Sequence, residues 1–71
     1  MSVPDIKVTF GKRLREVREA KGLSQESLAH EAGLDRTYVS SVERGKRNIS
    51  LENIERLARA LGISVKDLFR D

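Results

Sequence analysis

Apolar residues recur along this chain in short stripes at helical spacing. Phe10, Leu14 and Val17, for example, stand at positions i, i+4 and i+7, which lie on one face of an α-helix. Glycine commonly ends such a helix, because it adopts the left-handed conformation without strain. Four glycines follow stripes of this kind: Gly22, Gly33, Gly45 and Gly62. Since no segment alternates apolar and polar residues for long, as half-buried strands do, the chain is predicted to be all-α.

The first three helices have recognisable start signals. Asp5 or Thr9 would cap the first helix, and Ser24 caps a second helix of about two turns. Asp35 is placed to cap a third helix over about residues 36–44. Helices two and three are thus joined by three or four residues that include a glycine. This spacing indicates a helix-turn-helix.

Two further helices are predicted after a polar loop. Ser50 is placed to cap the fourth helix. Five apolar residues of that helix are expected to share one face: Leu51, Ile54, Leu57, Ala58 and Leu61. Ser64 with Asp67 three residues later is typical of a capping box, which would begin a final short helix. We therefore expect five helices and no strands.

The length of 71 residues limits the organisation of the chain. Two separate cores would each fall below the roughly 40 residues at which unaided folding usually fails. We therefore expect one domain over residues 1–71, with residues 1–6, which include Pro4, being mobile. A separate catalytic domain has no room in such a chain.

Composition excludes several classes of site. The chain has no cysteine and a single histidine, His30, so we expect no disulfide, metal or other cofactor. No apolar run approaches the ~18 residues of a membrane span, and we expect a soluble, cytoplasmic protein with no membrane partner. Fourteen Lys and Arg against eleven Asp and Glu give a net charge of +3. That charge favours polyanions without proving that one is bound.

The surface of the third helix gives the first indication of a ligand. On a helical wheel, where successive residues are 100° apart, five residues of this helix fall within a sector of roughly 140°. They are Arg36, Thr37, Ser40, Ser41 and Arg44. Tyr38, Val39 and Val42 lie on the opposite side and should face the core, with Glu43 at the border. Arginine can bind guanine with two hydrogen bonds, and small hydroxyl residues let a helix approach the bases, so this sector suits a major groove. An ordinary solvated helix face is the alternative.

Several motifs at fixed spacing extend this interpretation. They are Leu23-Ser24-Gln25-Glu26-Ser27-Leu28-Ala29, Ala32-Gly33-Leu34, Tyr38-Val39, Glu43-Arg44-Gly45, Leu57-Ala58 and Leu61-Gly62. From about Phe10 to Phe69 the chain resembles the lambda-repressor-like helix-turn-helix family, which includes phage repressors and Cro proteins. The segments 35–40 and 47–51 look most similar to controller proteins of restriction–modification systems.

The resemblance implies roles for individual residues. Gln25 matches a position that binds a DNA phosphate, and the free N–H groups of a helix start support that role. Base contacts are implied for Arg36, Thr37 and Ser41, and in controller-like members for Ser40 and Tyr38, although the helical wheel directs Tyr38 towards the core. Phosphate contacts are implied for the following loop: Arg44, Lys46, Arg47 and Asn48. An ion pair between Arg18 and Glu43 is also implied, bracing the first helix against the third.

Proteins with a helix-turn-helix of this kind bind DNA as dimers. Dimers place two recognition helices about 34 Å apart, one turn of DNA, so a homodimer on a palindromic operator is expected. Ile63, Val65 and Phe69 are surplus apolar residues that would form the dimer interface, with closure of the monomer core as the alternative, above all for Leu68 and Phe69.

These features together predict a transcription regulator that binds double-stranded DNA, as repressor or activator, and the resemblance alone implies that it controls restriction–modification genes. An enzyme is not expected, because His30 stands alone between polar neighbours and the chain lacks a phosphate-binding glycine loop and a carboxylate pair at a buried position. No small-molecule ligand is expected. Glu16 and Glu19 interrupt the basic residues of the first helix and argue against a membrane-surface role. An antitoxin-type module that binds DNA and protein is the alternative.

Overall fold

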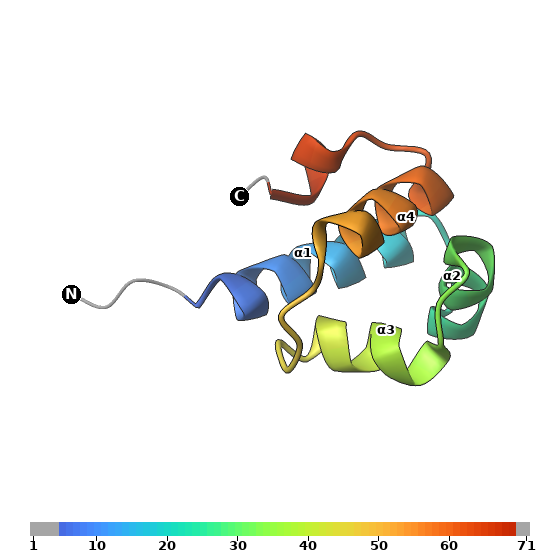
Figure 1. The fold of residues 1–71 in the computed structure, drawn as a ribbon. Helices are drawn as coiled ribbons and strands as arrows, with labels where there is room; N and C mark the ends of the chain where they lie inside the picture. The colour runs from blue at the N-terminus through green and yellow to red at the C-terminus, as the bar shows by residue number, and fades with distance from the viewer. Residues whose placement is uncertain (1–4, 70–71) are drawn as a thin grey trace.

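The computed structural model describes residues 5–69 (Figure 1). These residues form four α-helices and one 3₁₀ helix, with no strand among them: α1 (Ile6–Ala20), α2 (Gln25–Ala32), α3 (Arg36–Glu43), α4 (Leu51–Leu61) and η1 (Val65–Phe69). The prediction of an all-α chain is therefore confirmed.

Each α-helix begins at the cap expected from the sequence. Asp5, Ser24, Asp35 and Ser50 accept hydrogen bonds from backbone N–H groups at distances of 2.9, 3.0, 3.4 and 3.1 Å. The cap of α1 is thus Asp5 and not Thr9, so the helix starts within the segment 1–6 that was expected to be mobile. Residues 1–4 of that segment lie outside the described residues. The four stop glycines all have left-handed φ values between 71° and 74°.

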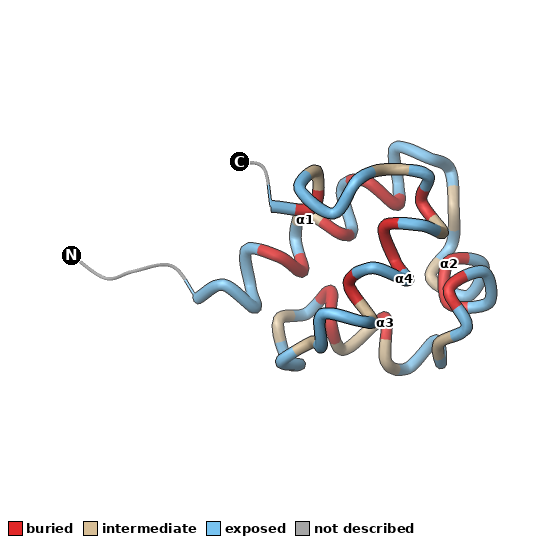
Figure 2. The backbone as a smooth tube through the Cα atoms, turned by 45° about the horizontal axis from the view of Figure 1, so that its top comes forward, coloured by how far each residue is buried: buried red, intermediate tan, exposed pale blue. Residues whose placement is uncertain are grey.

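One hydrophobic core lies between the helices. Figure 2 shows the buried segments of every helix turned towards a common centre. Six side chains are almost completely buried there: Leu14, Leu28, Val39, Val42, Leu57 and Leu68. In this arrangement α2 packs on α3 and α4, while α1 packs on α3 and η1. The recognition helix predicted from the sequence, α3, is therefore supported from behind by α1 and flanked by α2.

Two expectations about the C-terminal half are wrong. Leu51 does not join the buried face of α4, since 83% of it is exposed. It is the first residue of α4, and helical side chains lean towards the N-terminus, which carries Leu51 beyond the end of the core. The fifth helix is not an α-helix, because the Asp67 N–H bonds to the Ser64 carbonyl oxygen at 3.0 Å, an i to i+3 bond. A single turn of five residues favours the tighter 3₁₀ form.

The crossing of α1 and α3 depends on a missing side chain. Gly11 is buried in α1 where the two backbones meet. A Cβ atom at Gly11 would lie 2.7 Å from the Glu43 carbonyl oxygen and closer still to that of Val42. Only glycine therefore permits this approach.

None of the helices over residues 5–69 combines the length and apolar character needed to cross a bilayer.

Replacing Gly11 with alanine tests this close approach. Alanine favours a helix over glycine by about 1 kcal/mol, but overpacking costs typically 1–3 kcal/mol, and here the clash is with backbone that cannot rotate away. We expect Gly11→Ala to lower stability by about 2 kcal/mol and the midpoint of thermal unfolding by about 10 °C. Lys12→Ala, on the exposed side of the same helix, is the control. A Gly11→Ala protein as stable as wild type would contradict the proposed packing.

Candidate nucleic-acid interface

The segment from α2 to α3 forms a short, tightly bonded turn. Helix α2 ends at Ala32 and α3 begins at Arg36, so only three residues connect them. The Leu34 N–H reaches back to the Ala29 carbonyl oxygen at 2.8 Å, and Gly33 adopts φ 71°. The turn therefore holds α3 in a defined orientation against α2.

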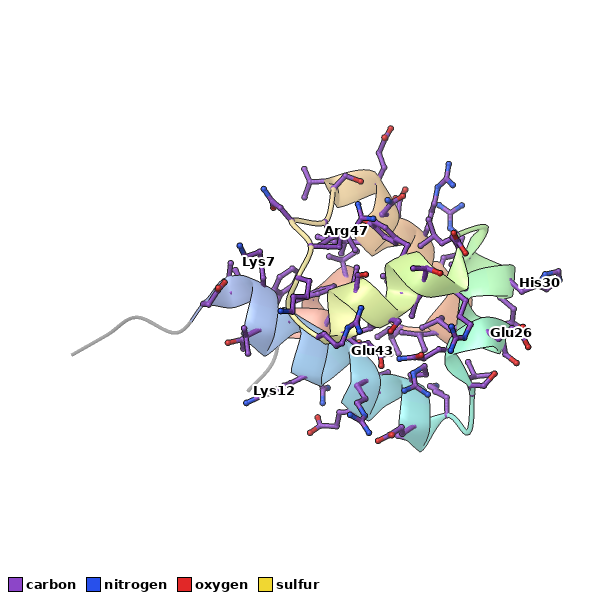
Figure 3. The ribbon with its side chains drawn as sticks, turned by 90° about the horizontal axis from the view of Figure 1, so that it is seen from below. Lys7, Lys12, Glu26, His30, Glu43 and Arg47 are labelled. Carbon is purple, nitrogen blue, oxygen red and sulfur yellow. The ribbon has the colours of Figure 1, made fainter. Side chains whose placement is uncertain are left out.

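The outward face of α3 is polar and largely unpaired. Arg36 and Thr37 are exposed, and Ser40 and Ser41 are partly exposed, above the buried Val39. Figure 3 views the molecule with α3 in front. The side chain of Arg36 makes no hydrogen bond or ion pair with any described residue and is available to a ligand. The observed face matches the sector predicted from the helical wheel.

Tyr38 lies at the edge of this face. Its ring is partly buried and packs against the core. The hydroxyl oxygen accepts a hydrogen bond from Asn53 Nδ2 at 3.1 Å, which ties it to the first turn of α4. The guanidinium carbon of Arg47 lies 5.1 Å from the ring centroid. The wheel's direction for Tyr38, towards the core, is thus the one observed.

Three cationic residues and an asparagine continue from α3 into the loop before α4. Arg44, Lys46, Arg47 and Asn48 are all exposed. Arg44 contacts the recognition face through a long hydrogen bond of 3.5 Å to the Ser41 hydroxyl. These side chains border the outward face of α3, which is where a DNA backbone would run beside a helix in the major groove.

A buried network lies behind the face. Arg18 Nε donates to Glu43 Oε2 at 2.6 Å and Arg18 Nη2 donates to Glu43 Oε1 at 3.0 Å, a two-bond ion pair. Arg18 Nη1 also donates to the Leu23 carbonyl oxygen at 2.8 Å, in the turn before α2. The hydrogen bonds to Glu43 raise the pKa of Arg18 above its ordinary value, against the opposing effect of burial. The structure thus brings together the two residues of the implied ion pair.

Gln25 extends this network to the surface. It is the first residue of α2, partly buried, and its Nε2 donates to Glu43 Oε1 at 3.0 Å. An amide nitrogen carries two hydrogens, so one remains for an external acceptor. The residue implied as a phosphate ligand is therefore held in place by the carboxylate that also pairs with Arg18.

The residues expected at a dimer interface are divided by the structure. Val65 and Phe69 on η1 are 39% and 48% exposed, whereas Ile63 is partly buried and packs against the core. Leu68 is completely buried, as its alternative role required. The Phe69 ring also contacts Phe10, with 5.2 Å between ring centroids, so one side of Phe69 closes the core and the other faces outward.

Two polar residues that the sequence analysis did not single out lie beside Tyr38 and the loop that follows α3. Lys7 lines a hollow of about 170 Å³ together with Arg47 and Asn48, and Asn53 holds the Tyr38 hydroxyl. Lys7 fell next to a segment expected to be mobile, and Asn53 is an ordinary polar residue of an amphipathic helix. Only the contacts of the folded chain bring them to this surface.

The remaining titratable groups form no competing site. No group of three or more His, Asp or Glu residues within 5–69 is arranged to hold a metal ion. His30 is exposed on α2 and points away from the body of the molecule (Figure 3). Within the described part of the chain, these groups therefore offer no metal-site alternative to the outward face of α3.

Comparisons with known proteins agree with this geometry. The model of the helix-turn-helix family matches residues 14–68. The chain is 53% identical to the control protein C.MunI of a Mycoplasma species, over 94% of this chain and 92% of that protein. It is 51% identical to the control protein C.BamHI of Bacillus amyloliquefaciens, over 90% and 80% of the two chains. The crystal structure of the restriction–modification controller protein C.AhdI from Aeromonas hydrophila superposes with a TM-score of 0.89 and 62% identity, covering 90% and 97%.

The buried ion pair gives a direct test of the network. Glu43→Ala would leave Arg18 buried and unpaired, and breaking a buried pair from one side typically costs about 3–5 kcal/mol. Glu31→Ala removes an exposed carboxylate from α2 and should change stability by less than about 0.5 kcal/mol. We therefore expect thermal unfolding to show a much lower midpoint for Glu43→Ala than for Glu31→Ala. Equal midpoints would remove the pair from this account.

Proposed function

The chain belongs to the helix-turn-helix family and is a transcription regulator homologous to restriction–modification controller proteins, not an enzyme; from this we propose that it binds a palindromic operator as a homodimer and controls restriction–modification genes. The observation that carries the proposal is the polar, largely unpaired outward face of α3, on which Arg36 has no partner among residues 5–69. It stands outward on a helix that α1 and α2 hold in place.

Base reading is assigned to the outward face of α3. Residues near the start of a recognition helix reach deepest into the major groove, which places Arg36 and Thr37 first and Ser40 and Ser41 after them. Arg36 has no competing partner among residues 5–69, so it keeps its donors for the O6 and N7 acceptors of guanine. The family resemblance implies a base contact for Tyr38 as well, although its hydroxyl oxygen already accepts a hydrogen bond from Asn53.

Phosphate binding is assigned to the residues around this face. Gln25 stands at the start of α2, where free N–H groups and the helix dipole favour an anion. The cationic loop after α3 lies on the other side of the recognition face and supplies Arg44, Lys46, Arg47 and Asn48. Such contacts contribute affinity and register, while discrimination between sequences comes from the bases.

The proposed dimer uses the outward parts of η1. Val65 and Phe69 expose apolar surface there, with Ile63 at its border. A second copy of the chain would cover these residues and bring two α3 helices to successive turns of the groove. Because the relatives are proteins of bacteria, whose DNA lies in the cytoplasm, we propose a cytoplasmic protein that needs no cofactor or small molecule.

Selection of bound sequences from random duplex DNA tests the function. We expect a palindrome with half-sites about one DNA turn apart, and affinity that falls steeply with salt. Arg36→Gln should lose about 1–3 kcal/mol of discrimination at one base pair in each half-site. Arg59→Gln, at an exposed arginine of α4, should keep full discrimination. If wild-type protein enriched no sequence, the operator-binding function would be refuted. A protein partner would then be sought instead.

Charge inserted at Val65 tests the dimer. Val65→Asp would bury a carboxylate at the proposed interface, so we expect the monomer mass in sedimentation and weaker operator binding. Val8→Asp is a matched control for the mass alone, because Val8 is also 39% exposed but lies on α1, against Gly45 of the cationic loop. A Val65→Asp protein with unchanged mass and affinity would place the interface elsewhere.

A further inference from the structure

Tyr38 is fixed on three sides in the free protein. Its ring packs against the core, its hydroxyl oxygen accepts the hydrogen bond from Asn53, and Arg47 covers the ring. A tyrosine that read a base would have to turn this hydroxyl away from α4 towards the groove. That movement would give up both the bond to Asn53 and the stack with Arg47.

The Tyr38 ring restricts the side chain of Arg47. It lies in the loop between α3 and α4, is exposed, and has no ion pair with any described residue. An arginine on such a loop samples many conformations, and ordering it on binding costs side-chain entropy. A cation held against an aromatic face is already restricted before the ligand arrives. The stack therefore prepares the Arg47 guanidinium beside the recognition face.

We infer that Tyr38, braced by Asn53, is a positioning residue that holds Arg47 for a DNA phosphate and does not itself read a base. The inference rests on the proposed DNA-binding function. It gives Asn53 a part in DNA binding through its contact with Tyr38. It also reverses, for Tyr38, the base-contacting role that the family resemblance implies.

A double-mutant cycle tests the inference through salt dependence. Binding to the selected operator and to an unrelated duplex would be measured for Tyr38→Leu, Arg47→Gln and the double variant at about 50 and 200 mM salt. Each phosphate contact contributes about 0.9 to the slope of log affinity against log salt concentration. For each single variant, we expect the affinity for the operator and the affinity for the unrelated duplex to fall by the same factor. The Arg47→Gln defect should shrink about 3.5-fold between the two salt concentrations, the loss of one phosphate contact, and the Tyr38→Leu defect should shrink in the same direction by at most that factor. The double variant should bind no more weakly than Arg47→Gln alone.

Controls separate this role from a general loss of structure. Arg59→Gln makes the same chemical change at an arginine whose side chain is 79% exposed on α4, and its salt slope should equal that of wild type. Asn53→Ala leaves the ring present and keeps the backbone N–H that Ser50 caps. It should shift binding in the same direction as Tyr38→Leu, by a smaller factor. If Tyr38→Leu failed to fold, the same cycle would be run with Asn53→Ala and Arg47→Gln.

Two results would overturn the inference while leaving the function intact. A Tyr38→Leu protein that lost affinity for the operator alone, with an unchanged salt slope, would show that Tyr38 reads a base. Defects that multiply in the double variant would show that Tyr38 and Arg47 act independently. Wild-type protein that bound neither duplex would instead refute the proposed function itself.

Discussion

The buried pair of Arg18 and Glu43 is the interaction on which the arrangement of the recognition helix depends. Arg18 comes from α1 and Glu43 is the last residue of α3, and further bonds from the same groups reach Leu23 before α2 and Gln25 at its start. An unpaired buried charge is costly, so these three helices keep their relative positions. Gly11 adds to this constraint, because it lets the α1 and α3 backbones meet at the same crossing.

The consequence is a recognition surface that is formed before DNA arrives. Among residues 5–69 the buried side-chain polar atoms are all hydrogen-bonded, whereas Arg36 on the outward face of α3 has no partner. At the edges, Gln25 is held by Glu43, and Arg47 is held by Tyr38. Groups ordered in advance lose less entropy on binding, so affinity is gained without new contacts. The fold thus separates residues that hold the surface from residues that meet the ligand.

Local sequence signals predicted most of the fold. Cap residues such as Ser24, stop glycines and apolar spacing depend on neighbours within one or two turns, and these predictions are confirmed. The failures involve what lies beyond a helix end: Leu51 has the right spacing but no element to cover it, and η1 is too short for an α-helix. The helical wheel directed Tyr38 correctly, but its bond to Asn53 joins segments 15 residues apart, which no local pattern encodes.

The central claim is that α3 reads base edges in the major groove through Arg36. Dimethyl sulfate footprinting measures this most directly, because the reagent methylates guanine N7, an acceptor that Arg is expected to bind. We expect protected guanines in two half-sites about one DNA turn apart. In Arg36→Gln, one guanine in each half-site should lose protection while the others stay protected. Unprotected guanines with bound wild-type protein, or the same protection in Arg36→Gln, would contradict it.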